Sequence, residues 1–302
     1  MAERRLLVLG ANGQLGYELC RALAPLGEVL AVTRHTAPHA FELAHPENLA
    51  ALITRARPAL IVNAAAYTAV DRAESEPALA ETINARAVGV LGECAARLDV
   101  PLVHYSTDYV FDGRAGTPYV EDAPTSPLNA YGHSKLAGER ALLESAAACL
   151  VLRTSWVYAA RGQNFLRTVL RLARAQPSLR IVDDQHGAPT WARSLADVTA
   201  LMVYRLGFTA ASWQACRGIY HASNSGATTW CGFARAILER IPAETDIVAR
   251  TVEAIGSADY PTPAARPRYS LLDNTKLRDT FDLTLEPWEY ALDKCMRDII
   301  DG

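Results

Sequence analysis

The first half of the chain alternates short, uninterrupted apolar runs with longer segments of mixed polarity. Runs of four to eight leucine-rich or β-branched residues are typical of parallel strands that are covered on both faces. The sequence therefore predicts buried strands, which lie at 6–10, 28–33, 59–66, 101–107 and 149–158.

The segments between these runs carry apolar residues at helical spacing, which predicts amphipathic helices. They lie at 13–24, 46–56, 78–98 and 131–146. Strands and helices that alternate at this length predict an α/β fold, in which a doubly wound parallel sheet has right-handed crossovers.

Beyond residue 160 predicted strands and helices no longer alternate regularly. The links between helical patterns become long and rich in proline, as in DYPTPAARPRYS. Helices are predicted at 164–175, 194–206, 229–241 and 287–300. We predict one domain over 1–160 and a smaller lobe mainly over 161–302. Segments within 181–223 are expected to return to the first sheet.

Composition and charge exclude several functional classes. The 302 residues are 50% hydrophobic and 21% charged, with a net charge of -3, as expected for a globular protein with a large core. Because no basic surface is indicated, nucleic acid and anionic membrane are not expected as partners.

The six cysteines are scattered without a C-x-x-C pair, which argues against a zinc site and a disulfide framework. Such cysteines fit a reducing compartment. No apolar run approaches 18 residues, so no membrane span is expected. We therefore expect a cytoplasmic protein, and the residues alone indicate no metal site.

The glycine motif GANGQLG at 10–16 joins the first predicted strand to the first predicted helix. Gly10 suits a tight turn, Gly13 lets backbone approach a pyrophosphate, and Gly16 permits close packing of helix and strand. The helix N-terminus would add N–H groups and a positive dipole end for the phosphates. This combination predicts a dinucleotide site in a Rossmann-type domain, whereas glycines in a plain turn would be purely structural.

The end of the second predicted strand bears on the choice of cofactor. A site for NAD usually has an acidic residue there that holds the ribose 2′-hydroxyl. This strand instead ends Val32-Thr33-Arg34, and a guanidinium can pair with a 2′-phosphate. The sequence favours NADPH, with NADH left open, although Arg34 could also be a solvated side chain.

Tyr131 and Lys135 lie four residues apart in the predicted helix 131–146, so their Cβ atoms should be about 5–6 Å apart. A phenol has a pKa of ~10, and a neighbouring ammonium group favours its ionised form. Beside a dinucleotide site, the pair predicts a general acid that protonates a carbonyl oxygen as hydride reaches the carbon. An isolated pair of this kind would more simply be two solvated side chains.

The stretch STDYVFDG at 106–113 follows the fourth predicted strand, at the sheet edge where open α/β sheets bind ligands. Thr107 or Ser106 could donate a second hydrogen bond to the carbonyl oxygen, and Asp108 could bind a hydroxyl group. The same residue types also cap turns, so a structural role stays open for them.

Together these motifs resemble the extended short-chain dehydrogenase/reductases, and most closely the dTDP-4-dehydrorhamnose reductases. The resemblance covers nearly the whole chain in eight ordered blocks, namely GANGQLG, NAAAYTAVDRAE (63–74), STDYVFDG, YGHSKLAGE, LRTSWVY (152–158), GQNF (162–165), DQHGAPT (184–190) and RPRYSLLD (266–273). It implies NADPH-dependent reduction of the 4-keto group of dTDP-4-dehydrorhamnose to dTDP-L-rhamnose.

The resemblance also implies roles for single residues. Tyr131 would be the acid, Lys135 its partner and ribose anchor, and Thr107 the carbonyl donor. The residues implied in cofactor binding are Gly10, Asn12, Gly13, Gln14, Leu15, Gly16, Arg34, Glu42, Leu43, Ala65, Ala66, Tyr67, Thr68, Tyr131 and Lys135. Those implied in substrate binding are Val70, Thr107, Asp108, Trp156, Asn164, Gln185 and Arg266.

Some features depart from the family or leave alternatives open. Glu42 stands where an aspartate is usual, and Cys231 where an aromatic residue is common. Glu18 matches one glutamate that holds Mg²⁺ at a dimer contact in some members, so Mg²⁺ and a homodimer are suggested by resemblance alone. The alternatives are a non-catalytic regulatory subunit of the same fold and a reductase or epimerase of another nucleotide sugar.

Overall fold

The computed structural model describes residues 4–34, 41–242 and 247–301. Its centre is a six-stranded parallel sheet in the order β10-β5-β4-β3-β1-β2. The strands are β1 (Arg5–Leu9), β2 (Glu28–Val32), β3 (Leu60–Asn63), β4 (Leu102–Thr107), β5 (Cys149–Thr154) and β10 (Gly218–His221). The predicted Rossmann-type α/β fold is confirmed.

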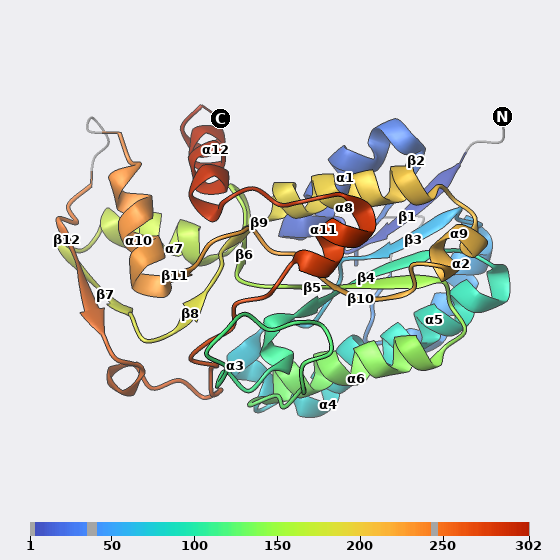
Figure 1. Cartoon of the computed structure of the whole chain (residues 1–302), viewed down its shortest axis with the longest axis horizontal. Coiled ribbons are helices and arrows are strands. Elements are labelled where there is room, and N and C mark those ends of the chain that lie inside the picture. The colour runs from blue at the N-terminus through green and yellow to red at the C-terminus, as the bar shows by residue number, and fades with distance from the viewer. Residues whose placement is uncertain (1–3, 35–40, 243–246, 302) are drawn as a thin grey trace.

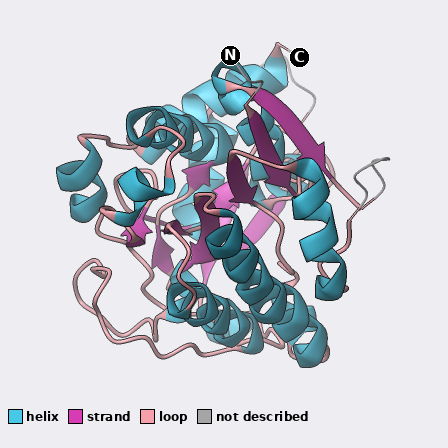
Figure 2. Ribbon diagram, turned by 90° about the vertical axis from the view of Figure 1, so that its right-hand side faces the viewer, coloured by secondary structure: helices cyan, strands magenta, loops and turns pink. Residues whose placement is uncertain are grey.

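Helices cover both faces of this sheet (Figure 1), so that the strands lie inside the molecule (Figure 2). One face carries α1 (Gln14–Leu23), α8 (Ala192–Leu206), α9 (Ala210–Gln214) and α11 (Thr275–Phe281). The other carries α2 (Leu49–Ala56), α5 (Ala87–Leu98) and α6 (Ala130–Glu144). Burial on both faces explains why the strands read as continuous apolar runs.

The two faces of β1 show the period of two that a strand imposes. Leu6 and Val8 pack in the core beneath α1 and α8, whereas Leu7 and Leu9 pack in the core on the opposite side. All four side chains are at most 1% exposed.

A second lobe has its own core, built around α7 (Phe165–Ala173), α10 (Trp230–Glu239) and α12 (Trp288–Ile300). Its strands form three pairs: β7 (Ser178–Val182) with β12 (Thr251–Ile255), β6 (Val157–Tyr158) with β9 (Thr190–Trp191), and β8 (His186–Gly187) with β11 (Thr228–Thr229). Within 181–223, β8 and β9 thus pair in this lobe while β10 joins the large sheet. The boundary near residue 160 stays a prediction.

The apolar run 149–158, predicted as one strand, is divided in two. β5 ends at Thr154, and Trp156 has a positive φ of 46°, which an extended strand cannot contain. The chain then enters β6, which belongs to the second lobe. The break therefore lies where the chain leaves the sheet, at the edge that carries the predicted site.

The segment 78–98, predicted as one helix, is also divided. It comprises α4 (Pro77–Glu81), a π-helical turn at Thr82–Arg86, and α5. The turn presents buried Asn84, whose amide group pairs with both backbone groups of Tyr67 and donates to Ser134. π-helical turns often occur near functional sites, where they redirect a side chain.

Short helical turns complete the chain at Ala24–Leu26, Pro46–Asn48, Val70–Ala73 (α3), Asp108–Val110 and Ser257–Asp259. Among the described residues, no helix has both the length and the apolar character needed to cross a membrane.

Candidate active site

The glycine loop lies between β1 and α1, where backbone segments approach closely. Gly10 has a φ of 80°, and a Cβ atom there would lie 2.8 Å from the backbone nitrogen of Ala65. A Cβ atom on Gly16 would lie 2.0 Å from the carbonyl oxygen of Gly10. Gly13 precedes α1 without a side-chain cap, so the first N–H groups of the helix are available to a phosphate.

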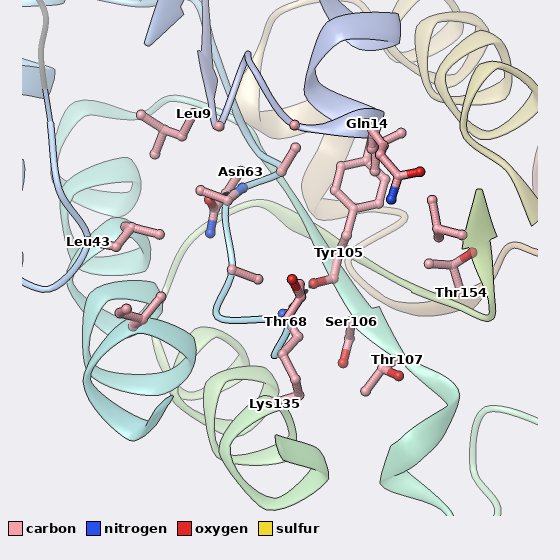
Figure 3. Close-up of a pocket in the computed structure, with 18 of the residues that line it drawn as sticks. Leu9, Gln14, Leu43, Asn63, Thr68, Tyr105, Ser106, Thr107, Lys135 and Thr154 are labelled. Carbon is pink, nitrogen blue, oxygen red and sulfur yellow. Dashed lines mark hydrogen bonds between the residues drawn. The ribbon is translucent and has the colours of Figure 1, made fainter. Parts of the chain in front are cut away.

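A cleft of about 790 Å³ opens at this loop, along the carboxyl ends of β1, β3 and β4 (Figure 3). It contains most of the residues predicted from the sequence. The predicted residues that line it are Gly10, Asn12, Gly13, Gln14, Leu15, Arg34, Glu42, Leu43, Ala65, Ala66, Thr68, Val70, Thr107, Asp108, Tyr131, Lys135, Trp156 and Asn164.

Gly16, Tyr67, Gln185 and Arg266 are not among the residues that line the cleft. Gly16 packs behind the loop, as its contact with Gly10 shows. The hydroxyl group of Tyr67 donates a hydrogen bond to Glu76 at 2.6 Å.

Tyr131 lies in the first turn of α6, whose N-cap residue Asn129 accepts a hydrogen bond from the Gly132 N–H at 2.8 Å. Burial raises the pKa of the Tyr131 phenol above its ordinary value. A hydrogen bond with Thr107 lowers it, and the charge of Asp108 raises it further. The phenol is therefore protonated at neutral pH, as a proton donor must be.

Lys135 extends from α6 to the end of β4, where its Nζ donates to the carbonyl oxygen of Tyr105 at 2.7 Å (Figure 3). The same Nζ lies 3.3 Å from His104 Nε2. Burial lowers the pKa of Lys135 to about 8, against the charge of Glu139, which raises it. The sequence suggested that Lys135 would lower the pKa of Tyr131, but here its amine is held by β4 and burial dominates the phenol.

Two hydroxyl groups in the cleft have no hydrogen-bond partner among the described residues, although both are buried. They are Ser106 Oγ, on the residue before the last of β4, and Thr154 Oγ1, on the last residue of β5. An unsatisfied buried polar group costs about 1–3 kcal/mol. A polar ligand bound in this part of the cleft would give these two hydroxyl groups the hydrogen-bond partners that they lack.

Asp108 follows β4 and is 2% exposed. Burial raises the pKa of its carboxyl group to about 6, although hydrogen bonds from Ser270 and Thr107 lower it. The Thr107 hydroxyl donates to Asp108 Oδ1 at 3.0 Å and so lies between the carboxylate and the phenol.

Trp156 forms the opposite side of the cleft, where its indole stacks on that of Trp230 with ring centroids 3.6 Å apart. A Cβ atom on Gly187 would lie 2.5 Å from the indole, so glycine makes room for the ring. The pair thus adds aromatic surface to the cleft that the ends of β4 and β5 also line.

Three predicted substrate residues are held by other side chains. Asn164 Nδ2 donates to Gln14 Oε1 at 2.7 Å, which joins the second lobe to the glycine loop. Arg266 forms a two-point ion pair with Asp71, at 2.9 and 2.8 Å. Gln185 donates to Ser257 Oγ at 3.0 Å.

Three residues of this region were missed by sequence reasoning, namely Asn63, His104 and Trp230. Asn63 and Trp230 line the cleft, and His104 is buried beside Lys135. Asn63 begins the block NAAAYTAVDRAE and His104 lies within the fourth predicted strand, so both are close in sequence to residues that were predicted for the site. Trp230 lies 74 residues from its stacking partner, and no local pattern pairs them.

Residues 4–300 match the family model of the RmlD substrate binding domain. The chain belongs to this family. It is 47% identical to a dTDP-4-dehydrorhamnose reductase of Burkholderia thailandensis, over 98% of this chain and 99% of the relative. It is 42% identical to the dTDP-4-dehydrorhamnose reductase of Escherichia coli K12, over 97% of each chain.

Among solved structures of similar proteins is the dTDP-4-dehydrorhamnose reductase of Bacillus anthracis in complex with NADP. It has a TM-score of 0.86 and 31% sequence identity, over 98% of this chain and 99% of that chain. The resemblance that the motifs indicated is confirmed.

The Mg²⁺ suggested by resemblance to some RmlD-type reductases does not fit the surroundings of Glu18. This carboxylate is 4% exposed and already accepts hydrogen bonds from Arg21 Nε and Arg193 Nε, each at 3.0 Å. Arg193 also pairs with Asp298 at 2.7 Å, so a guanidinium lies between the two acids. No group of three potential metal ligands occurs in the described ranges.

Arg34 and Glu42, which the sequence predicted to bear on the choice of cofactor, both line the cleft and are largely exposed. Arg34 Nε is 3.9 Å from Glu42 Oε1, and the two side chains are 65% and 48% exposed. Because both are largely solvated, their attraction is weak. If Arg34 turned toward a phosphate, it would lose only this weak attraction to Glu42.

Proposed function

We propose that this protein reduces the 4-keto group of dTDP-4-dehydro-6-deoxy-L-mannose to give dTDP-L-rhamnose, with NADPH as cofactor. The observation that carries the proposal is the near-complete match to curated reductases together with Thr107, Tyr131 and Lys135 in one cleft. A non-catalytic subunit would not need this acid–base set.

The chain's own residues would act as follows. NADPH, when bound, supplies the hydride. Tyr131 donates its phenolic proton to the carbonyl oxygen, which becomes the C4 hydroxyl. Thr107, whose hydroxyl lies between the phenol and Asp108, orients the same oxygen. General acid catalysis of this kind contributes ~10²–10⁴-fold to a rate.

Binding would be divided between the two sides of the cleft. The glycine loop and the N-terminus of α1 hold the pyrophosphate of the cofactor. Lys135 anchors the nicotinamide ribose, and Arg34 favours NADPH over NADH through the 2′-phosphate. Val70, Asp108 and Trp156 border the sugar, since an aromatic plane suits the C–H face of a hexose.

The remaining predicted substrate residues would act from the second lobe. Arg266 suits a diphosphate, but a ligand must first compete with Asp71 for its guanidinium. Asn164 and Gln185 would hold the lobe in place around the substrate. A homodimer in the cytoplasm remains our prediction for the protein as a whole, and sedimentation of the purified chain tests the oligomeric state.

The test is consumption of NADPH by the purified protein with the dTDP-4-keto sugar, with the UDP analogue as the matched control. We expect stoichiometric NADPH oxidation and dTDP-L-rhamnose as product, with the dTDP sugar used preferentially. Sugar isomerisation without net NADPH consumption would indicate an epimerase. NADPH binding without turnover of either sugar would indicate a non-catalytic subunit.

A further inference from the structure

The five tryptophans of the chain fall into two groups. Trp191, Trp213 and Trp288 are at most 6% exposed, as expected for rings that fill a core. Trp156 and Trp230 are only partly buried, and both line the cleft. Apolar surface left open in a cleft is typical of a ligand-binding wall, so these two rings call for a role beyond packing.

The backbone of Trp156 is in an unfavourable conformation. Its φ of 46° lies in the left-handed region, which steric contacts disfavour for a bulky residue. Such a conformation persists only where the surroundings hold it. The carbonyl oxygen of Trp156 accepts a hydrogen bond from the Thr190 N–H at 3.3 Å, which fixes the backbone but leaves the orientation of the indole to its own contacts.

One face of the Trp156 indole is covered by Trp230. The two ring centroids are 3.6 Å apart, and the ring planes differ by 9°. At this separation the rings are in van der Waals contact, so no ligand atom fits between them. A sugar can therefore meet only the other face of Trp156 or its edge.

Gly187 bounds the same indole from β8. A Cβ atom there would lie 2.5 Å from Cε2 and 2.9 Å from Nε1 of Trp156. Gly187 lies in a strand and does not have a positive φ, so its backbone does not require glycine. Glycine is needed here for the space that its missing side chain leaves to the ring.

Trp230 is itself held firmly. It is the first residue of α10, whose N-cap residue Thr229 accepts a hydrogen bond from the Gly232 N–H at 2.9 Å. The ring of Phe165 packs against it with a centroid distance of 4.6 Å. The strand that leads into α10, β11, pairs with β8, so the elements that carry Trp230 and Gly187 are joined. Together they form a preformed slot for the Trp156 indole.

We propose that Trp230 is a positioning residue for the sugar, which stacks on Trp156 and holds that indole in the slot beside Gly187. Its part in sugar use rests on the proposed function. Trp230 acts through Trp156: without the stacked ring, the indole would take up other orientations and the wall that borders the sugar would no longer be fixed.

The first test measures the position of the Trp156 indole in the ligand-free protein, through nuclear Overhauser effects between this ring and the α-protons of Gly187. Trp156→Phe identifies the indole signals. We expect the contact in the wild type and in Trp230→Phe, and its loss in Trp230→Leu. A contact of wild-type strength in Trp230→Leu would overturn the proposal. This measurement needs neither cofactor nor sugar, so its failure and failure of the turnover assay are distinguishable.

The second test separates use of the sugar from binding of the cofactor. In Trp230→Leu we expect kcat/KM for the dTDP-4-keto sugar to fall about 10-fold, mainly through KM, with NADPH affinity preserved. Trp230→Phe should recover most of the loss. Gly187→Ala should produce a similar fall, because its Cβ displaces the indole, and it tests the slot if Trp230→Leu does not fold. Wild-type KM in both variants would overturn the proposal.

A double variant tests whether Trp230 acts through its partner. In a Trp156→Ala background there is no indole left to position, so adding Trp230→Leu should lower kcat/KM for the sugar no further. Losses that multiply would show that Trp230 contacts the sugar directly, which would overturn the positioning role.

Trp288→Leu is the matched control, because Trp288 packs in the core of the same lobe and is not among the residues that line the cleft. We expect it to lower stability to urea at least as much as Trp230→Leu, while kcat/KM for the sugar stays within a few-fold of wild type. Trp288→Phe replaces it if it does not fold. An equal fall in kcat/KM in the control would show that loose packing of the lobe, and not the position of Trp156, impairs sugar use.

Discussion

The sheet wall of the cleft, formed by the ends of β1, β3 and β4 with α6, holds its functional groups largely with backbone atoms. Gly10 and Gly16 are constrained by backbone contacts, and Lys135 is held by a strand carbonyl group. The lobe wall, formed by Trp156, Trp230 and Asn164, relies more on side chains, through the stacked indoles and the hydrogen bond from Asn164 to Gln14. Arg266 lies outside the cleft and is held in the same way, by the side chain of the distant Asp71.

This difference distinguishes the residues that would take part in the reaction from those that would hold the sugar. Groups fixed by a sheet and a helix terminus have little freedom, which suits proton transfer and phosphate binding, where small displacements are costly. Groups held by pairs of side chains can exchange one partner for a ligand. We therefore expect changes in the sheet wall to affect turnover, and changes in the lobe wall to affect the use of the sugar.

The largest effect should come from Tyr131→Phe in the sheet wall. This change removes one oxygen and keeps the ring, so NADPH should still bind while turnover falls by ~10²–10⁴. Lys135→Met should be at least as damaging, and the double variant should lose no more than the worse single one. Steady-state rates with the dTDP-4-keto sugar measure this.

Tyr105→Phe is the matched control, because it removes another buried hydroxyl from the same wall. That hydroxyl is 2.9 Å from Thr199 Oγ1 rather than near the acid. We expect a loss of about 1 kcal/mol in stability and little change in turnover. A Tyr131→Phe variant within a few-fold of wild type would refute the role of the phenol.

A smaller effect is expected from Trp156→Ala in the lobe wall. Loss of aromatic surface next to the sugar should cost about 2 kcal/mol of binding, or roughly 30-fold in kcat/KM. NADPH affinity, measured by fluorescence titration, should be preserved because the indole lies away from the glycine loop. A variant that loses NADPH or unfolds would show that Trp156 serves the core.

Arg193→Ala tests a junction between the two regions, since Arg193 of α8 joins Glu18 of α1 to Asp298 of α12. The nearly buried Glu18 would keep only Arg21, which should cost about 1–2 kcal/mol in urea unfolding. Mg²⁺ or a chelator should leave wild-type stability unchanged. Destabilisation of the wild type by the chelator would show that Glu18 does hold a metal.

The smallest effect is expected from Arg34→Ala at the rim. Arg34 is largely exposed, so its removal should reduce the preference for NADPH over NADH only a few-fold. The ratio of kcat/KM for the two cofactors measures this. An unchanged ratio, or a wild-type preference for NADH, would remove Arg34 from cofactor selection.

The same contrast explains what the sequence could predict. Strands, helices and the glycine loop of the first half follow from local pattern, and Gly16 is required by its contact with Gly10 within one βα unit. The contact of Gly10 with Ala65 after β3 is not local. Asn63 ends β3 and His104 lies within β4, and the contact of His104 with Lys135 depends on a lysine carried by another element. Their importance appears only when three elements come together.

The second lobe was less predictable because its contacts are distant and its strands are short. β6, β8, β9 and β11 each have two residues, too few to show a period. Arg266 was predicted to bind a diphosphate, and an arginine that suits a diphosphate suits a carboxylate equally well. Its pairing with Asp71, 195 positions away, produces no pattern in the local sequence.

The π-helical turn at Thr82–Arg86 sets the tolerance of this region to insertions and deletions. An α-helix advances about 100° per residue, so the extra residue of the turn rotates α4 by about that angle relative to α5. Deleting one residue would restore an unbroken helix and carry Asn84 away from Tyr67 and Ser134. Substitutions at exposed positions from 77 to 98 should therefore be tolerated, whereas an insertion or deletion in this segment should not.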